Sequence, residues 1–280
     1  MAVFTLSKPR RITDKKYIMP KLSKKWSKKR CAYRHEYNKT RYGSMKNMFH
    51  ERKTHRSNFL PPDLLEMVRE KLDELYQDVH VEDRPTFLSR GKVAMNRRDA
   101  LWYAIPTSDG FLPHYRASTA SYGSPHIKIK KADDTKAMDN NMLEWMQPII
   151  DRLEHISGHK INHFVFHRYV GTEDKIGAHH DKTQDLGDGS TIFSLSIGES
   201  RRLDILADTK DKWIEKNERE TFIVKDNDLI CMPWDINQVY RHTIVPSKQY
   251  GGVRYSITAR SKCTLYNKES KEQKIINTKF

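Results

Sequence analysis

The stretch YRHTIVPSKQYGGVRYSITARS, residues 240–261, holds two runs rich in β-branched and aromatic residues on either side of a break that contains Pro, Ser and Gly. This pattern is typical of two strands joined by a loop. In the second run every other residue is polar, and side chains at alternate positions face the same side of a strand. These residues are Arg254, Ser256, Thr258 and Arg260. The stretch therefore predicts paired strands with one polar face.

Five similar short runs lie upstream, separated by Gly, Asp, Asn, Lys and Pro: NHFVFHRYV, STIFSLSIG, RRLDIL, RETFIVK and DLICMPW. With the two runs above, QVYRHTIV and VRYSITARS, they make seven. Many short strands without a helical pattern between them favour an antiparallel sandwich or barrel. Two stretches nearer the N-terminus, 60–79 and 140–158, instead repeat apolar residues at the spacing of an amphipathic helix. The sequence therefore predicts an α+β protein with N-terminal helices flanking a double-sheet β core.

Charge is distributed unevenly along the chain. Of its 51 Lys/Arg and 36 Asp/Glu, residues 1–60 hold 18 and 3, which leaves 33 of each sign for the other 220 residues. The net charge of +15 is therefore that of a basic arm on a neutral body. Trp26 and Tyr33 interrupt the basic residues, so the arm can neutralise phosphates and stack on bases. A solvated tail or a localisation signal is the alternative.

We expect three segments: the basic arm at 1–58, the folded domain at 59–265 and a polar C-terminal tail at 266–280. No run of about 18 apolar residues suggests a membrane span, and the N-terminus lacks the pattern of a secretory signal. The three cysteines, Cys31, Cys231 and Cys263, are far apart and match no zinc spacing. They predict free thiols in a reducing, intracellular setting. No residue indicates an oligomeric state.

The stretch KIGAHHDKTQDL, residues 175–186, carries candidate metal ligands. In a strand His179 and Asp181 share a face while His180 points away. Two histidines and one carboxylate form the facial arrangement of non-haem Fe(II) oxygenases, which requires a second, distant histidine. Two exposed histidines in a loop are the alternative.

The alternating run at 254–260 has a comparable pair of interpretations. Arg254 and Arg260 on one interior face would be costly to bury unless anions meet them, and a guanidinium suits a carboxylate. A metal site with such arginines suggests a keto acid that chelates iron at one end and pairs with arginine at the other. The alternative is an outward-facing polar face.

Four segments in order, within about 160–262, resemble the AlkB-like 2-oxoglutarate- and Fe(II)-dependent dioxygenases. The family pattern is N-x-Y, then H-x-D, a distant H, and R-x-N-x-T-x-R. The residues that match it are Tyr169, His179, Asp181, His242, Arg254, Thr258 and Arg260.

The resemblance implies a double-stranded β-helix, or jelly roll. It implies Fe(II) bound by His179, Asp181 and His242. It further implies 2-oxoglutarate held by Arg254 and Tyr169, and Arg260 close to the metal. With O2 such a site hydroxylates a C–H bond, and an N-methyl group so treated is lost as formaldehyde.

The chain departs from the pattern at several positions. His167 and Ser256 stand where the family has asparagines that touch the co-substrate, and both can still form hydrogen bonds. Thr183 stands where DNA-repair members have an acidic residue that recognises the methylated base. Upstream, Tyr115 and Tyr122 are candidates for stacking on a flipped base, or for core packing.

The function predicted first is oxidation of an alkyl group on a DNA or RNA base, as in demethylation or DNA repair. An N-alkylated base or a 5-methylpyrimidine would fit. One alternative is hydroxylation of a protein side chain or small molecule. The other is a non-catalytic nucleic-acid-binding jelly roll.

Overall fold

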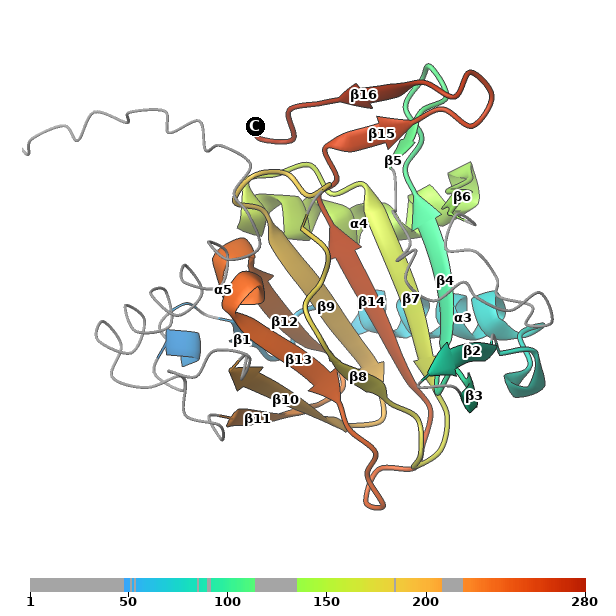
Figure 1. Cartoon of the computed structure of the whole chain (residues 1–280), viewed down its shortest axis with the longest axis vertical. Coiled ribbons are helices and arrows are strands. Elements are labelled where there is room, and N and C mark those ends of the chain that lie inside the picture. Colours follow the sequence, from blue (N-terminus) through green and yellow to red (C-terminus); the bar gives the residue numbers. More distant parts are fainter. Residues whose placement is uncertain are drawn as a thin grey trace, which may run out of the picture.

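Two facing sheets form the body of the molecule (Figure 1). The computed structural model describes residues 48–50, 52, 54–84, 86–89, 92–113, 135–183, 185–207 and 219–280. Within these ranges the larger sheet has the order β1 (His55–Arg56), β12 (Asp228–Pro233), β9 (Thr191–Gly198), β14 (Arg254–Arg260), β7 (His163–Tyr169), β4 (Asp99–Ala104) and β6 (Lys136–Ala137). The smaller sheet has the order β11 (Arg219–Val224), β10 (Arg201–Ala207), β13 (Tyr240–Ile244) and β8 (Ile176–His179).

Shorter elements surround the two sheets. A separate hairpin pairs β2 (Thr86–Ser89) with β3 (Lys92–Met95), and a small sheet has the order β16 (Gln273–Ile275), β15 (Thr264–Tyr266) and β5 (Leu112–Pro113). Besides residues 48–50, which are helical, the described ranges contain the helices α3 (Pro62–Tyr76), α4 (Asn140–Ser157), the short α5 (Trp234–Val239) and the 3-10 turn η1 (Val81–Asp83). In the described part of the chain, no helix has the length and apolar character that a membrane crossing requires.

The predicted α+β jelly roll is confirmed. All seven predicted runs form strands, and α3 and α4 form within the two stretches with helical spacing. β4 and β8 were not among the predicted runs, and α5 interrupts a region that was expected to hold strands alone. β8 and α5 span only four and six residues, too few for a periodic pattern to stand out.

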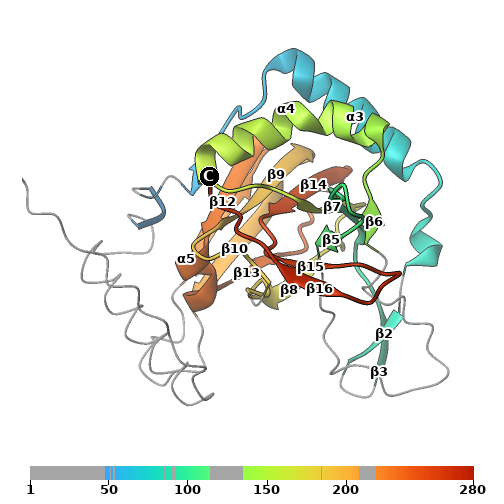
Figure 2. The same cartoon turned by 90° about the horizontal axis from the view of Figure 1, so that it is seen from above.

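Helices α3 and α4 cover the outer face of the larger sheet (Figure 2). Asp139 caps the start of α4, where its side chain accepts a hydrogen bond from the amide of Met142 (2.8 Å), and Gly158 caps the end of the helix in the left-handed conformation. Apolar residues of both helices bury against the sheet's outward side chains, such as Phe164 and Phe193. A second core fills the space between the two sheets. Because the larger sheet is covered on both faces, its inner polar residues are held in a buried environment.

The packed domain extends beyond both of the limits, 59 and 265, that we expected from the sequence. Residues 1–47 of the basic arm lie outside the described residues, but Met48 and Phe49 are buried in the core between the sheets, and β1 pairs with β12. At the other end β16 pairs with β15, and Thr278 is buried. The polar side chains of these end segments gave no sign of the pairing, because strand pairing satisfies backbone hydrogen-bonding groups whatever the side chains are.

Candidate metal and anion site

The three predicted metal ligands converge between the sheets. His179 is the last residue of β8, and His242 lies directly opposite it on β13. Their ring centroids are 4.3 Å apart, and the Nε2 atom of His179 lies 3.6 Å from an Asp181 carboxylate oxygen. One nitrogen or oxygen atom from each of the three residues lies within 4.8 Å of the others, so together they could hold a metal ion.

The hydrogen bonds around the histidines leave nitrogen lone pairs for that ion. The Nδ1 atom of His179 lies 2.8 Å from the carbonyl oxygen of Gly177. Because a carbonyl only accepts, this contact assigns the proton to Nδ1 and leaves Nε2 as the free lone pair. Burial, reinforced by the nearby His179, lowers the pKa of His242 to about 4. His242 is therefore neutral, as a metal ligand must be, across the physiological pH range.

Asp181 is kept ionised by a neighbouring arginine. Burial, the largest single effect, would raise its pKa, but the charge of Arg260 acts together with His179 and His242 to hold the pKa well below the usual value. The guanidinium donates to one carboxylate oxygen through Nη2 (2.8 Å) and Nε (3.2 Å). Two imidazoles and a carboxylate, without a thiolate, form a donor set that suits Fe(II), so these residues fit that metal.

A second buried arginine, Arg254, lines the site. Arg254 is only 2% exposed, its guanidinium lies 5.1 Å from the ring centroid of Tyr169, and its Nε donates to the Ser196 hydroxyl (2.9 Å). Among the described residues its Nη1 atom has no hydrogen-bond partner. A buried cation with an unused donor favours an anionic ligand, and a carboxylate fits a guanidinium best. The site therefore also fits a dicarboxylic keto acid.

The two residues that stand where the family has co-substrate asparagines, His167 and Ser256, line the same cavity. Ser256 exchanges a hydrogen bond with Ser194 (2.9 Å), and the Nδ1 atom of His167 accepts one from the Nε of Arg98 (3.3 Å). Burial and the charge of Arg98 hold the pKa of His167 well below its usual value, so this ring is neutral. Both positions thus present neutral hydrogen-bonding groups to a ligand in the cavity.

One cavity brings together every iron and co-substrate residue predicted from the sequence. Its lining includes His167, Tyr169, His179, Asp181, His242, Arg254, Ser256, Thr258 and Arg260. His180 does not line it, in agreement with the alternation along the strand. Thr183 lies two residues beyond Asp181 and also does not line the cavity. Tyr115 and Tyr122 lie outside the described residues.

Sequence reasoning missed an aromatic residue beside the site. Trp102 pairs with Val165 on β7, which pairs with Thr258 on β14. Because directly paired residues project from the same face, Trp102 lies on the face that bears the site. It lines a groove at the edge of the larger sheet together with Lys136 and Lys268. Alternation in strand β4 would have indicated this face, had that strand been recognised.

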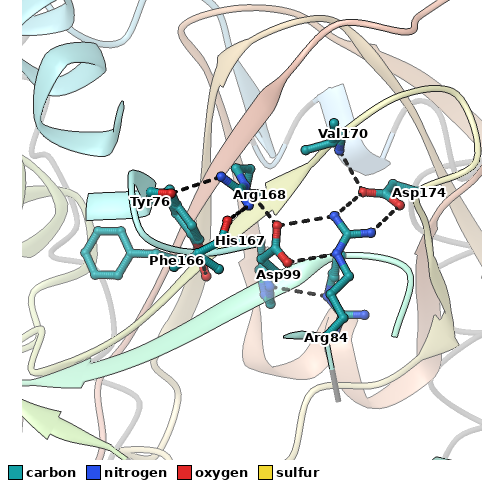
Figure 3. A network of polar contacts seen from close by, with 10 residues as sticks. Tyr76, Arg84, Asp99, Phe166, His167, Arg168, Val170 and Asp174 are labelled. Carbon is teal, nitrogen blue, oxygen red and sulfur yellow. Dashed lines mark hydrogen bonds and ion pairs between the residues drawn. The ribbon is translucent and has the colours of Figure 1, made fainter. Parts of the chain in front are cut away.

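A buried ionic network lies beside His167, which lines the cavity (Figure 3). Arg84 donates to Asp99 (2.8 and 3.2 Å) and to Asp174 (two contacts of 2.7 Å), and these three side chains are almost fully buried. Arg168 donates to the same Asp99 (2.8 Å) and, through its other nitrogens, to the backbone carbonyls of residues 76 and 79. Asp174 also accepts from the amide of Val170 (2.7 Å). The network thus joins the end of α3, strands β4 and β7, and the turn that leads into β8.

Comparisons with known proteins agree with this geometry. A family model described as the 2OG-Fe(II) oxygenase superfamily matches residues 109–260. An uncharacterised protein of Acanthamoeba polyphaga mimivirus, R406, is 31% identical over 110 residues, which are 39% of this chain and 54% of that protein.

Two mammalian relatives carry a name that states an activity. The DNA oxidative demethylase ALKBH2 of Bos taurus and that of Homo sapiens are each 23% identical over 192 residues, which are 67% of this chain and 63% and 67% of those proteins. The chain thus spans between about half and two thirds of the length of these relatives. Because the family model matches more than half of its residues, the chain belongs to the 2OG-Fe(II) oxygenase superfamily, whose members are oxidoreductases that use Fe(II), 2-oxoglutarate and O2.

Proposed function

We propose that this protein oxidises an alkyl group on a nucleic-acid base, with His179, Asp181 and His242 as the Fe(II) ligands. The oxygenase activity rests on one observation: the same cavity holds these three ligands and the buried Arg254, whose Nη1 has no hydrogen-bond partner among the described residues. A degenerate, non-catalytic jelly roll would have no reason to keep such costly groups buried together.

The polar side chains of the cavity have distinct tasks in this proposal. Arg254 and Tyr169 receive the distal carboxylate of 2-oxoglutarate, while His167 and Ser256 offer hydrogen bonds to its remaining oxygens. Arg260 keeps Asp181 ionised and oriented. Bound Fe(II), with 2-oxoglutarate and O2, supplies the oxidising chemistry that inserts one oxygen atom into a substrate C–H bond and the other into succinate, with release of CO2.

Three features support a nucleic-acid substrate. The groove beside the cavity combines the Trp102 ring with the exposed lysines 136 and 268, and an aromatic face with nearby cations suits a base and its phosphates. The basic arm would add contacts to phosphates. The ALKBH2 relatives are named DNA oxidative demethylases. We therefore place the target base against this groove, with its alkyl group directed at the metal.

The test measures succinate by mass spectrometry after O2 is admitted to anaerobic protein, Fe(II) and 2-oxoglutarate. Separate reactions contain N-methylated single- and double-stranded DNA, N-methylated RNA, 5-methylcytosine DNA, thymine DNA or no substrate. His179→Ala is the inactive variant. His155→Ala is its matched control, because His155 is an exposed histidine on helix α4.

Succinate that rises with one nucleic acid, persists in His155→Ala and disappears in His179→Ala would support the whole proposal and name the substrate. Equal, slow succinate in every reaction would keep the oxygenase and redirect the substrate to a protein side chain or small molecule. Succinate no higher than in His179→Ala would refute the proposed catalysis and favour a binding module.

A further inference from the structure

Strand pairing alone does not fix the position of Asp181. β8 is an edge strand of the smaller sheet and pairs with β13 at only two positions, with a shift in register between them. It ends at His179, so Asp181 lies beyond the last residue of the strand. An edge strand with few ladder contacts opens easily. Arg260 contacts the Asp181 carboxylate, but some other contact must hold the Asp181 backbone near the two imidazoles.

Asn237, on helix α5, supplies that contact. Its Nδ2 donates to the carbonyl oxygen of Asp181 (2.9 Å), and its Oδ1 accepts from the amide of Asp181 (2.9 Å). The side-chain amide thus takes the place of a peptide group on a neighbouring strand. The carbonyl oxygen of Asn237 also lies 2.6 Å from the Nδ1 atom of His180. His180 therefore projects away from the cavity into a hydrogen bond with α5.

The helix that carries Asn237 is buried. Asn237, Ile236 and Val239 are all fully buried, and the latter two pack in the core between the sheets. Helix α5 leads directly into β13, which carries His242 five residues after Asn237. One short, buried segment therefore holds the Asp181 backbone at one end and presents the second imidazole at the other. The segment thus links the Asp181 backbone to the strand that carries His242.

We propose that Asn237 is a positioning residue for the metal: by clamping the backbone of Asp181 to α5, it sets the geometry at which the carboxylate meets the two imidazoles. The proposal rests on the ligand assignment of the proposed function. Groups that orient metal ligands typically change metal affinity roughly 10- to 100-fold when removed. The expected effect of losing the clamp is a loss of affinity in that range.

A matched control separates positioning from general stability. Asn227 forms the same reciprocal pair with Leu60, donating to its carbonyl oxygen and accepting from its amide (2.8 Å each). This clamp joins the end of the larger sheet to the segment before α3 and does not line the cavity. Asn227 also has a φ of 59°, so alanine there adds backbone strain. Asn227→Ala should thus destabilise the fold at least as much as Asn237→Ala.

The experiment titrates the full-length, metal-free protein with Co(II) under anaerobic conditions and records the ligand-field absorption and the dissociation constant. Urea unfolding of the metal-free protein gives the stability of each variant. We expect Asn237→Ala to raise the Co(II) dissociation constant roughly 10- to 100-fold and to alter the absorption spectrum. Asn227→Ala should stay within about threefold of the unmutated protein despite its lower stability. If Asn237→Ala does not fold, Asn237→Leu removes both hydrogen bonds and leaves little cavity.

The variant His179→Ala separates an error in the ligand assignment from an error in the positioning role of Asn237. If His179→Ala binds Co(II) as well as the unmutated protein, the ligand assignment itself is wrong. If His179→Ala loses binding while Asn237→Ala and Asn237→Leu keep the original affinity and spectrum, the positioning role of Asn237 is refuted and the ligand assignment stands. Equal weakening by Asn237→Ala and Asn227→Ala would also refute it, since both clamps would then act only through stability.

Discussion

Arg84→Met should be one of the most destabilising single changes in this protein. The Arg84 side chain is 3% exposed and forms four hydrogen bonds to two carboxylates that are themselves nearly inaccessible. Methionine fills much of the same volume but cannot donate a hydrogen bond. The dominant effect is therefore an uncompensated buried charge, which typically costs about 3–5 kcal/mol.

The two carboxylates are not affected equally. Asp99 keeps the hydrogen bond from Arg168, whereas Asp174 keeps only the amide of Val170 among the contacts described above. Most of the lost unfolding free energy should therefore come from Asp174. Because only one of the two carboxylates loses most of its partners, we expect a cost near the lower end of the range, about 3 kcal/mol. Replacing that carboxylate by an amide in the double variant Arg84→Met/Asp174→Asn should recover about 1–2 kcal/mol.

Urea unfolding followed by circular dichroism measures these differences at pH 7. The control is Lys71→Met, which breaks an exposed pair with Glu74 three residues away on α3 and should cost at most about 0.5 kcal/mol. A loss below about 1 kcal/mol in Arg84→Met, or a double variant less stable than the single one, would show that the network does not bury charge as we infer.

Three further predictions concern the co-substrate, the pH and the arm. Arg254→Lys keeps the charge but loses the guanidinium fork, so 2-oxoglutarate affinity, measured calorimetrically with Mn(II), should fall about 10- to 100-fold; an unchanged affinity would remove Arg254 from the co-substrate site. Burial and Arg98 hold the pKa of His167 well below 6.5, so below pH 6.5 the unfolded chain takes up a proton that the folded protein does not, and stability falls as the pH drops. Urea unfolding should show that, between pH 7.5 and 5.5, the unmutated protein loses about 1 kcal/mol more unfolding free energy than His167→Asn does. Equal losses in the two proteins would contradict the neutral state of His167. Deleting residues 1–47 should weaken nucleic-acid binding and flatten its salt dependence, whereas an unchanged salt slope would exclude the arm from the interface.

The strands and most of the proposed site could be predicted from local patterns. Alternation along a strand is a property of neighbouring residues, so it correctly assigned Arg254, Ser256, Thr258 and Arg260 to one face and separated His179 from His180. The same alternation in STIFSLSIG places Ser194 on the cavity side. The order of the motifs then indicated the family before any contact was known.

Other features depended on contacts between distant segments. Asn237 meets Asp181 across 56 residues of sequence, and Arg84 meets Asp174 across 90. Neither asparagine in a short helix nor arginine in a loop carries a local pattern that identifies its partner. The sequence by itself determined which side chains face the interior of each strand, because that depends on a two-residue period. The tertiary structure alone decided which of them meet, because sheet order and the path of the connecting segments set those distances.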